Sequence, residues 1–150
     1  PKPQNPRSHS GNKFCNLLFV IVMLFAKVFG LVATVSGNGV IELTDDNFSS
    51  LMNEIPNPSG WFINFHTDWC GHCKALTPIW HELAASYAHG VNVAEINCTE
   101  SALTCDKYQV RAYPTLYYFP VDGSHIVNYT GRRDVASLEK FILQESANHS

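Results

Sequence analysis

Apolar residues fall into short blocks along the chain, separated by polar or amphipathic stretches. These blocks predict five strands, at residues 40–43, 61–67, 91–97, 115–119 and 125–129. The block at 61–67 is apolar on both faces, as expected for a central strand that helices cover on each side. The last two strands alternate around Val121-Asp122-Gly123, which predicts a hairpin.

Helices are predicted between these strands, at about residues 44–55, 71–88, 101–108 and 134–145. Thr44 is expected to cap the first helix, whose first turn carries Asp45 and Asp46 where the helix dipole favours negative charge. Pro56 ends that helix. The resulting order is β-α-β-α-β-α-β-β-α, with no repeat and no linker long enough to separate two domains.

The first 36 residues differ from the rest of the chain. Residues 14–35 are nearly continuous in Leu, Val, Ile and Phe, with basic residues before them and small residues after them. This pattern predicts a secretory signal peptide cleaved near Ser36 or Gly37. The run is also long enough for an uncleaved signal anchor, although Lys27 in its middle disfavours a stable span. We expect a signal peptide or signal anchor over residues 1–36 and one domain over 37–150.

Charge limits the partners of this domain. Residues 1–36 hold four of the 10 basic residues and none of the 13 acidic ones, so the formal charge falls from −3 to −7 without them. An acidic domain argues against nucleic acid or an anionic lipid surface as the main partner. Membrane attachment is expected only if residues 14–35 are an uncleaved anchor.

Cysteines and glycosylation motifs indicate an oxidising compartment. Cys15 lies in the predicted signal, which leaves four cysteines that can form two pairs. The four Asn-x-Ser/Thr motifs begin at Asn47, Asn97, Asn128 and Asn148. We therefore expect the endoplasmic reticulum lumen or the secretory pathway, with secretion and membrane anchoring both left open.

The strongest chemical signal is Trp69-Cys70-Gly71-His72-Cys73, which directly follows the predicted central strand. If a helix begins at Cys70, unpaired backbone N–H groups and the helix dipole stabilise a thiolate there. Cys73 lies one turn later and is shielded by its own helix. The spacing predicts a redox pair in which Cys70 is an exposed nucleophile and Cys73 the resolving thiol. His72 is expected to favour the Cys70 thiolate.

Other interpretations of these residues stay open. The pair could be an inert structural bridge, and His72 an exposed helix residue without a role. The four cysteines could also form a zinc site, although Cys98 and Cys105 are seven residues apart, unlike a second C-x2-C pair. We expect no metal, because the secretory context favours disulfides.

Four segments, in this order, resemble a thioredoxin-fold domain of the protein disulfide isomerase family. They are residues 40–48, 69–78, 97–100 and 108–115, within a similarity that covers about residues 39–145. The resemblance implies an α/β thioredoxin fold, in which helices flank a central mixed β-sheet and the CxxC motif lies at a helix N-terminus. It also implies a cis peptide bond between Tyr113 and Pro114.

The resemblance implies roles for individual residues. Those implied to be catalytic are Cys70, Gly71, His72, Cys73 and Arg111. Those implied to bind substrate are Trp69, Tyr113 and Pro114. Arg111 matches a mobile arginine that lowers the pKa of the resolving cysteine, and Cys98 and Cys105 match a second, structural disulfide. No cofactor is implied.

Two residues depart from the family pattern. Asn64 stands where the family usually has a buried glutamate that accepts the proton of the resolving thiol, and an amide cannot take that proton. Asp68 stands where a proline usually precedes the tryptophan. A carboxylate there opposes the nearby thiolate or acts as a substitute base. We expect turnover to be slow at the step where Cys73 loses its proton.

The expected function is thiol–disulfide oxidoreductase or isomerase activity on secretory proteins, through a mixed disulfide on Cys70. The expected partners are unfolded or disulfide-bearing client proteins, with a thiol oxidase or glutathione as redox partner. Two alternatives stay open. One is a chaperone-like module that binds peptides with marginal redox turnover, and the other is a general thioredoxin-like reductase.

Overall fold

The computed structural model describes residues 39–55, 59–86 and 90–149, and the predicted signal segment lies outside them. The strands are β1 (Ile41–Leu43), β2 (Trp61–His66), β3 (Asn92–Asn97), β4 (Thr115–Phe119) and β5 (Val127–Tyr129). The helices are α2 (Phe48–Glu54), α3 (Gly71–Ser86), α4 (Ala102–Lys107) and α5 (Val135–Asn148). Among these helices, none has the length and apolarity needed to cross a bilayer.

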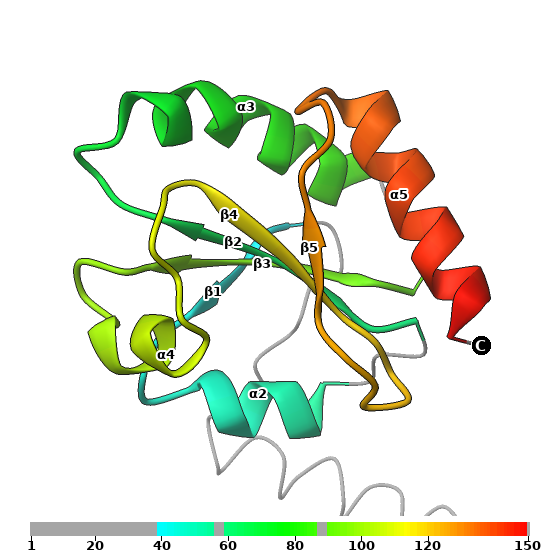
Figure 1. Ribbon diagram of the computed structural model, residues 1–150, viewed down its shortest axis with the longest axis horizontal. Helices are drawn as coiled ribbons and strands as arrows, with labels where there is room; N and C mark the ends of the chain where they lie inside the picture. The colour runs from blue at the N-terminus through cyan, green and yellow to red at the C-terminus, as the bar shows by residue number, and fades with distance from the viewer. Residues whose placement is uncertain (1–38, 56–58, 87–89, 150) are drawn as a thin grey trace, which may run out of the picture. The chain divides into compact units, whose positions relative to one another are not determined.

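The five strands form one mixed sheet in the order β1-β3-β2-β4-β5. β1 and β2 pair with β3 in parallel, whereas β4 is antiparallel to β2 and β5 is antiparallel to β4. Helices α3 and α5 cover one face of the sheet, and α2 and α4 cover the other (Figure 1). This arrangement confirms the predicted α/β thioredoxin fold.

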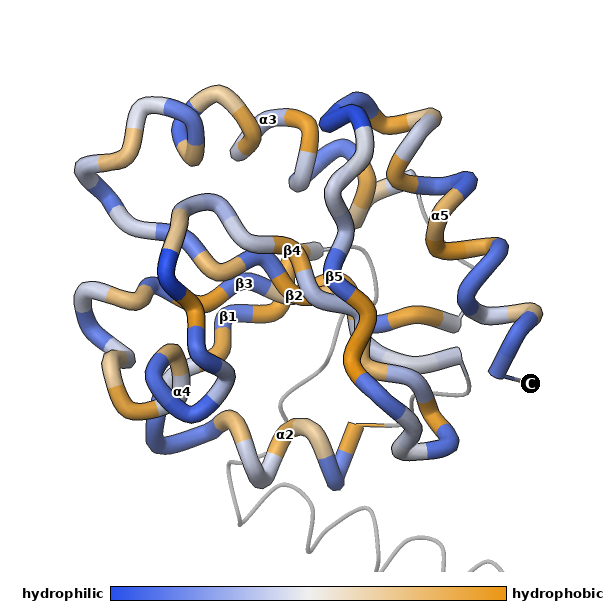
Figure 2. Tube along the Cα trace, viewed as in Figure 1, coloured by the Kyte–Doolittle hydropathy of each residue, from blue (hydrophilic) through white to orange (hydrophobic). Residues whose placement is uncertain are grey.

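Strand β2 contributes side chains to both cores, which is why four of its six residues are large and apolar. Phe62 packs under α3 and α5, whereas Trp61, Ile63 and Phe65 pack against α2 and α4. Figure 2 shows orange, apolar segments on the central strands, with blue, polar segments between them. Burial on both faces makes β2 the fixed centre of the domain, so the segment that follows it starts from a rigid position.

Trp80 fixes α3 against the sheet. Its ring centroid lies 4.9 Å from that of Phe62, and its indole N–H donates to the carbonyl oxygen of Ala94 on β3 at 3.1 Å. The Trp80 side chain is fully buried. These contacts tie the middle of α3 to two strands, and they leave the first turn of α3 at the carboxyl end of β2.

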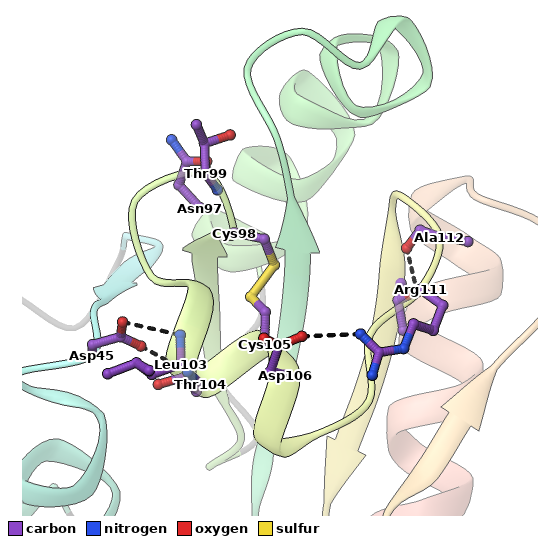
Figure 3. The surroundings of a disulfide bond; sticks show 11 residues. Asp45, Asn97, Cys98, Thr99, Leu103, Thr104, Cys105, Asp106, Arg111 and Ala112 are labelled. Carbon is purple, nitrogen blue, oxygen red and sulfur yellow. Dashed lines mark hydrogen bonds and ion pairs between the residues drawn. A yellow bond between two sulfur atoms is a disulfide. The ribbon is translucent and has the colours of Figure 1, made fainter.

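α2 begins at Phe48, one turn later than predicted. Thr44 caps the turn that leads into it: its hydroxyl oxygen accepts the N–H of Asn47 at 3.3 Å, and its carbonyl oxygen accepts the N–H of Phe48 at 2.9 Å. The side-chain oxygen of Asn47 accepts the N–H of Thr44 in return, at 2.7 Å. Asp45 instead accepts the N–H groups of Leu103 and Thr104 in the first turn of α4 (Figure 3). The hydrogen bonds from Thr104 hold the pKa of Asp45 below its ordinary value.

Candidate active site

A four-residue turn connects β2 to α3 and delivers Cys70 to the helix start. The N–H of Cys70 donates to the carbonyl oxygen of Thr67 at 3.3 Å, and the carbonyl of Cys70 accepts the N–H of Lys74 at 3.1 Å. The N–H of Cys73 donates to the Cys70 sulfur at 3.3 Å. The sulfur therefore occupies the place of the side-chain oxygen that usually caps a helix.

The pKa values of the two thiols are shifted in opposite directions. Burial disfavours the Cys70 thiolate, but hydrogen bonds from the Cys73 thiol and from the backbone N–H groups of Cys73 and His72 outweigh it. The pKa of Cys70 consequently lies below the value of a free thiol. Burial raises the pKa of Cys73 to about 11, and the neighbouring Cys70 sulfur adds to the increase. At neutral pH Cys70 is therefore the better nucleophile of the pair.

Cys70 is less exposed than the sequence predicts. Its residue exposure is 8%, against 3% for Cys73. The Cys70 thiol donates to the carbonyl oxygen of Tyr113 at 3.5 Å, which turns the sulfur toward the loop before β4. The sequence overestimates the exposure of Cys70 because the loop before β4, 43 residues later in the chain, covers the start of α3.

Aromatic side chains flank Cys70 beside a cis peptide bond. The bond between Tyr113 and Pro114 is cis, as the resemblance implies. Trp69 is 71% exposed, and its ring meets that of Tyr113 edge to face at 5.8 Å between centroids. The Cys70 sulfur thus lies next to an exposed aromatic side chain, that of Trp69, and next to the Tyr113 carbonyl oxygen, which accepts its hydrogen bond.

His72 and Gly71 begin α3 in different surroundings. The His72 side chain lines a groove of about 210 Å³ together with Ala75, Leu76, Ile79 and Arg133. Its backbone N–H donates a hydrogen bond to the Cys70 sulfur. A Cβ added at Gly71 would meet no atom within 4 Å. The expected effect of the His72 imidazole on the Cys70 thiolate stays a prediction.

The structure shows Arg111 in a surface ion pair, and its role at the resolving cysteine stays a prediction. Its guanidinium pairs with Asp106 on α4 at 2.9 Å, and both side chains are exposed (Figure 3). A second arginine, Arg133, acts on the dithiol, because its charge favours the thiolate of both Cys70 and Cys73. Arg133 also donates to the carbonyl oxygen of Pro114 at 3.4 Å. Sequence reasoning missed it, although the segment just before α5 carries two adjacent arginines, Arg132 and Arg133.

Cys98 and Cys105 are joined in a disulfide between the end of β3 and α4 (Figure 3). Cys70 and Cys73 are free thiols. The four-thiolate zinc site that the sequence left open therefore lacks two of its ligands. Within residues 39–55, 59–86 and 90–149, no group of three or more potential ligands is arranged to hold a metal.

Asn64 is buried on the face of the sheet that α3 covers. Side chains alternate along a strand, so Asn64 shares the face of Phe62, which packs against Trp80 of α3. Its exposure is 2%, and its side-chain oxygen has no hydrogen-bond partner among the described residues. An amide in this place supplies no base to a thiol whose pKa is raised to about 11.

We predict that Arg133→Gln raises the pKa of Cys70, because a positive charge that favours the thiolate is removed. The half-point of iodoacetamide alkylation should move to higher pH, and alkylation near pH 7 should slow. Arg111→Gln is the matched control and should leave the profile unchanged. An equal or larger shift in the Arg111 variant would show that Arg133 has no specific role at the Cys70 thiolate.

Comparison with known proteins agrees with the geometry. A family model described as Thioredoxin matches residues 39–144. A protein disulfide-isomerase of Schizosaccharomyces pombe is 38% identical over 133 residues, which is 87% of this chain and 34% of that protein. Protein disulfide-isomerase 5-1 of Arabidopsis thaliana is 35% identical over 109 residues, covering 71% of this chain and 73% of that protein.

Solved structures show the same similarity. The first thioredoxin domain of mouse protein disulfide-isomerase A4 has a TM-score of 0.63 at 28% identity, covering 73% of this chain and 76% of that chain. This chain spans only 34% of the S. pombe relative and 38% of protein disulfide isomerase-like 2-2 of Oryza sativa. The chain belongs to the thioredoxin family, among its protein disulfide isomerase-like members.

Proposed function

We propose that this protein is a thiol–disulfide oxidoreductase that forms, reduces or rearranges disulfides in client proteins through a mixed disulfide on Cys70. The observation that carries the proposal is the opposite shift of two thiol pKa values within one helical turn. Cys70 has a lowered pKa and Cys73 a pKa of about 11. An inert structural pair requires no such difference.

The exchange follows from this asymmetry. The Cys70 thiolate attacks one sulfur of a client disulfide, so a Cys70–client bond forms, the client disulfide breaks, and the released client thiolate takes up a proton. Cys73 then loses its proton and attacks the Cys70 sulfur. This step forms the 70–73 disulfide and releases the second client thiol. The reverse sequence transfers the 70–73 disulfide to a reduced client.

The surroundings of Cys70 support an extended client segment as substrate. Trp69 and Tyr113 offer an exposed aromatic surface beside the sulfur. The Tyr113 carbonyl oxygen faces the dithiol, because it accepts a hydrogen bond from the Cys70 thiol. A client strand that pairs with this backbone would bring its own sulfur to Cys70. The two thiols carry the electrons, so the reaction requires no bound cofactor.

The endoplasmic reticulum lumen or another secretory compartment is the proposed location. The Cys98–Cys105 disulfide supports it, since such bonds persist in oxidising compartments. The apolar run at residues 14–35 with its basic flank supports it from the sequence. In that setting glutathione or a thiol oxidase would reoxidise the Cys70–Cys73 pair.

Cys73→Ser should trap clients as covalent adducts, because the resolving thiol is absent and the mixed disulfide cannot be released. Adducts from a secretory expression host should exceed those of the wild type by about tenfold or more, and they should disappear on reduction. Cys70→Ser is the control and should yield none. Equal adduct levels in the two variants would contradict exchange and favour the peptide-binding alternative, in which Trp69 holds clients without covalent chemistry.

Asn64→Glu should accelerate release of the mixed disulfide, because it places a carboxyl group on the face of β2 that α3 covers. General-base catalysis contributes about 10²-fold or more, so an increase of at least about tenfold is expected. Stopped-flow measurement of the second exchange step with a model disulfide checks this. Asn64→Gln, which adds length without basicity, is the control. An unchanged release rate would show that loss of the Cys73 proton does not limit turnover.

A further inference from the structure

Asp68 occupies the second position of the turn that presents Cys70. The turn runs from Thr67 to Cys70 and is closed by the hydrogen bond between their backbones at 3.3 Å. The Asp68 carboxylate accepts a hydrogen bond from the side-chain amide of Asn97 at 3.0 Å. Asn97 is the last residue of β3, so the bond joins the reactive turn to a neighbouring strand end.

Three hydrogen bonds hold Asn97 in place. Its backbone carbonyl accepts the N–H groups of Glu100 and Ser101, at 3.1 and 2.8 Å. Its side-chain oxygen accepts the N–H of Thr99 at 3.0 Å. With both its backbone carbonyl and its side-chain oxygen engaged, the amide NH₂ group is fixed in direction. Asn97 therefore acts as a rigid donor toward Asp68.

The second disulfide reinforces this corner. Cys98 follows Asn97 directly, and its N–H donates to the carbonyl oxygen of His66 at the end of β2 at 2.8 Å. The bond from Cys98 to Cys105 closes the loop that contains the partners of Asn97 (Figure 3). The loop closed by this disulfide therefore bonds to two sites next to the reactive turn. One is His66, at the end of β2 before the turn, and the other is Asn97, which donates to Asp68 in the turn.

We propose that Asn97 is a positioning residue for Cys70, acting through its hydrogen bond to Asp68. The proposal rests on the proposed exchange function and concerns the same dithiol. An ordinary residue at the second position of a turn leaves the backbone freer than a proline there. The Asn97–Asp68 bond restricts that freedom instead. It keeps the Cys70 sulfur in line with the Cys73 N–H, a contact that weakens steeply with misalignment.

A double-variant cycle tests this proposal. Asn97→Ala should lower the rate of Cys70 alkylation by iodoacetamide at pH 7 by about threefold to tenfold, the range that one hydrogen bond supports. The alkylation profile should move to higher pH, which a purely structural role would not cause. In an Asp68→Pro background, where the ring fixes the turn, Asn97→Ala should have little further effect.

Matched variants separate the hydrogen bond from other changes. Thr99→Ala removes the glycosylation motif of Asn97 but keeps its side chain, and it should alkylate like the wild type. Replacing both Cys98 and Cys105 with Ser should slow alkylation in the same direction as Asn97→Ala. If Asp68→Pro fails to fold, Asp68→Ala takes its place, and its effect should not add to that of Asn97→Ala.

The proposal is overturned if Asn97→Ala leaves alkylation unchanged, or if it slows the wild type and the Asp68→Pro protein by the same factor. Alkylation reports on Cys70 without any client. If Asn97→Ala slows alkylation as expected but the wild-type protein exchanges no disulfide with a client, the proposed function is refuted and the positioning role of Asn97 still holds.

Discussion

The hydrogen bond from the Cys73 N–H to the Cys70 sulfur connects the fold of this protein to its chemistry. It exists because β2 is buried on both faces and Trp80 fastens α3 across the sheet. A turn of fixed length then sets Cys70 at the first unpaired N–H groups of the helix. The same helix buries Cys73 and raises its pKa to about 11. The same packing arrangement thus makes the Cys70 thiol reactive and keeps the Cys73 thiol protonated.

This asymmetry has a chemical consequence for the pair as a whole. A thiolate stabilised in the reduced state makes the corresponding disulfide a stronger oxidant, as is known for disulfide-donating proteins. Arg133 adds to the effect at both sulfurs. We expect Asn64 to slow completion of the cycle, because an amide on the face of β2 that α3 covers accepts no proton. On this proposal the site begins exchange more readily than it finishes it.

The sequence predicts the parts of this structure that local patterns determine. The mostly apolar run of β2 and the CxxC spacing predict the central strand and the helix that follows it. The family resemblance supplied the Tyr113–Pro114 bond and the partner of Cys98. The failures involve contacts between distant segments. Asp45 binds the start of α4 rather than its own helix, and the charge of Arg133, 60 residues after Cys73 in the chain, favours both thiolates. Neither contact has a periodicity or spacing that marks it.

The reduction potential of the Cys70–Cys73 pair tests the central claim most directly. Equilibration of the purified protein in glutathione buffers of graded ratio, followed by mass measurement of the trapped thiols, gives the value. A stabilised Cys70 thiolate predicts a potential of about −180 to −210 mV, near that of the endoplasmic reticulum glutathione pool. A potential of about −270 mV, like that of thioredoxin, would contradict the account and indicate a dedicated reductase.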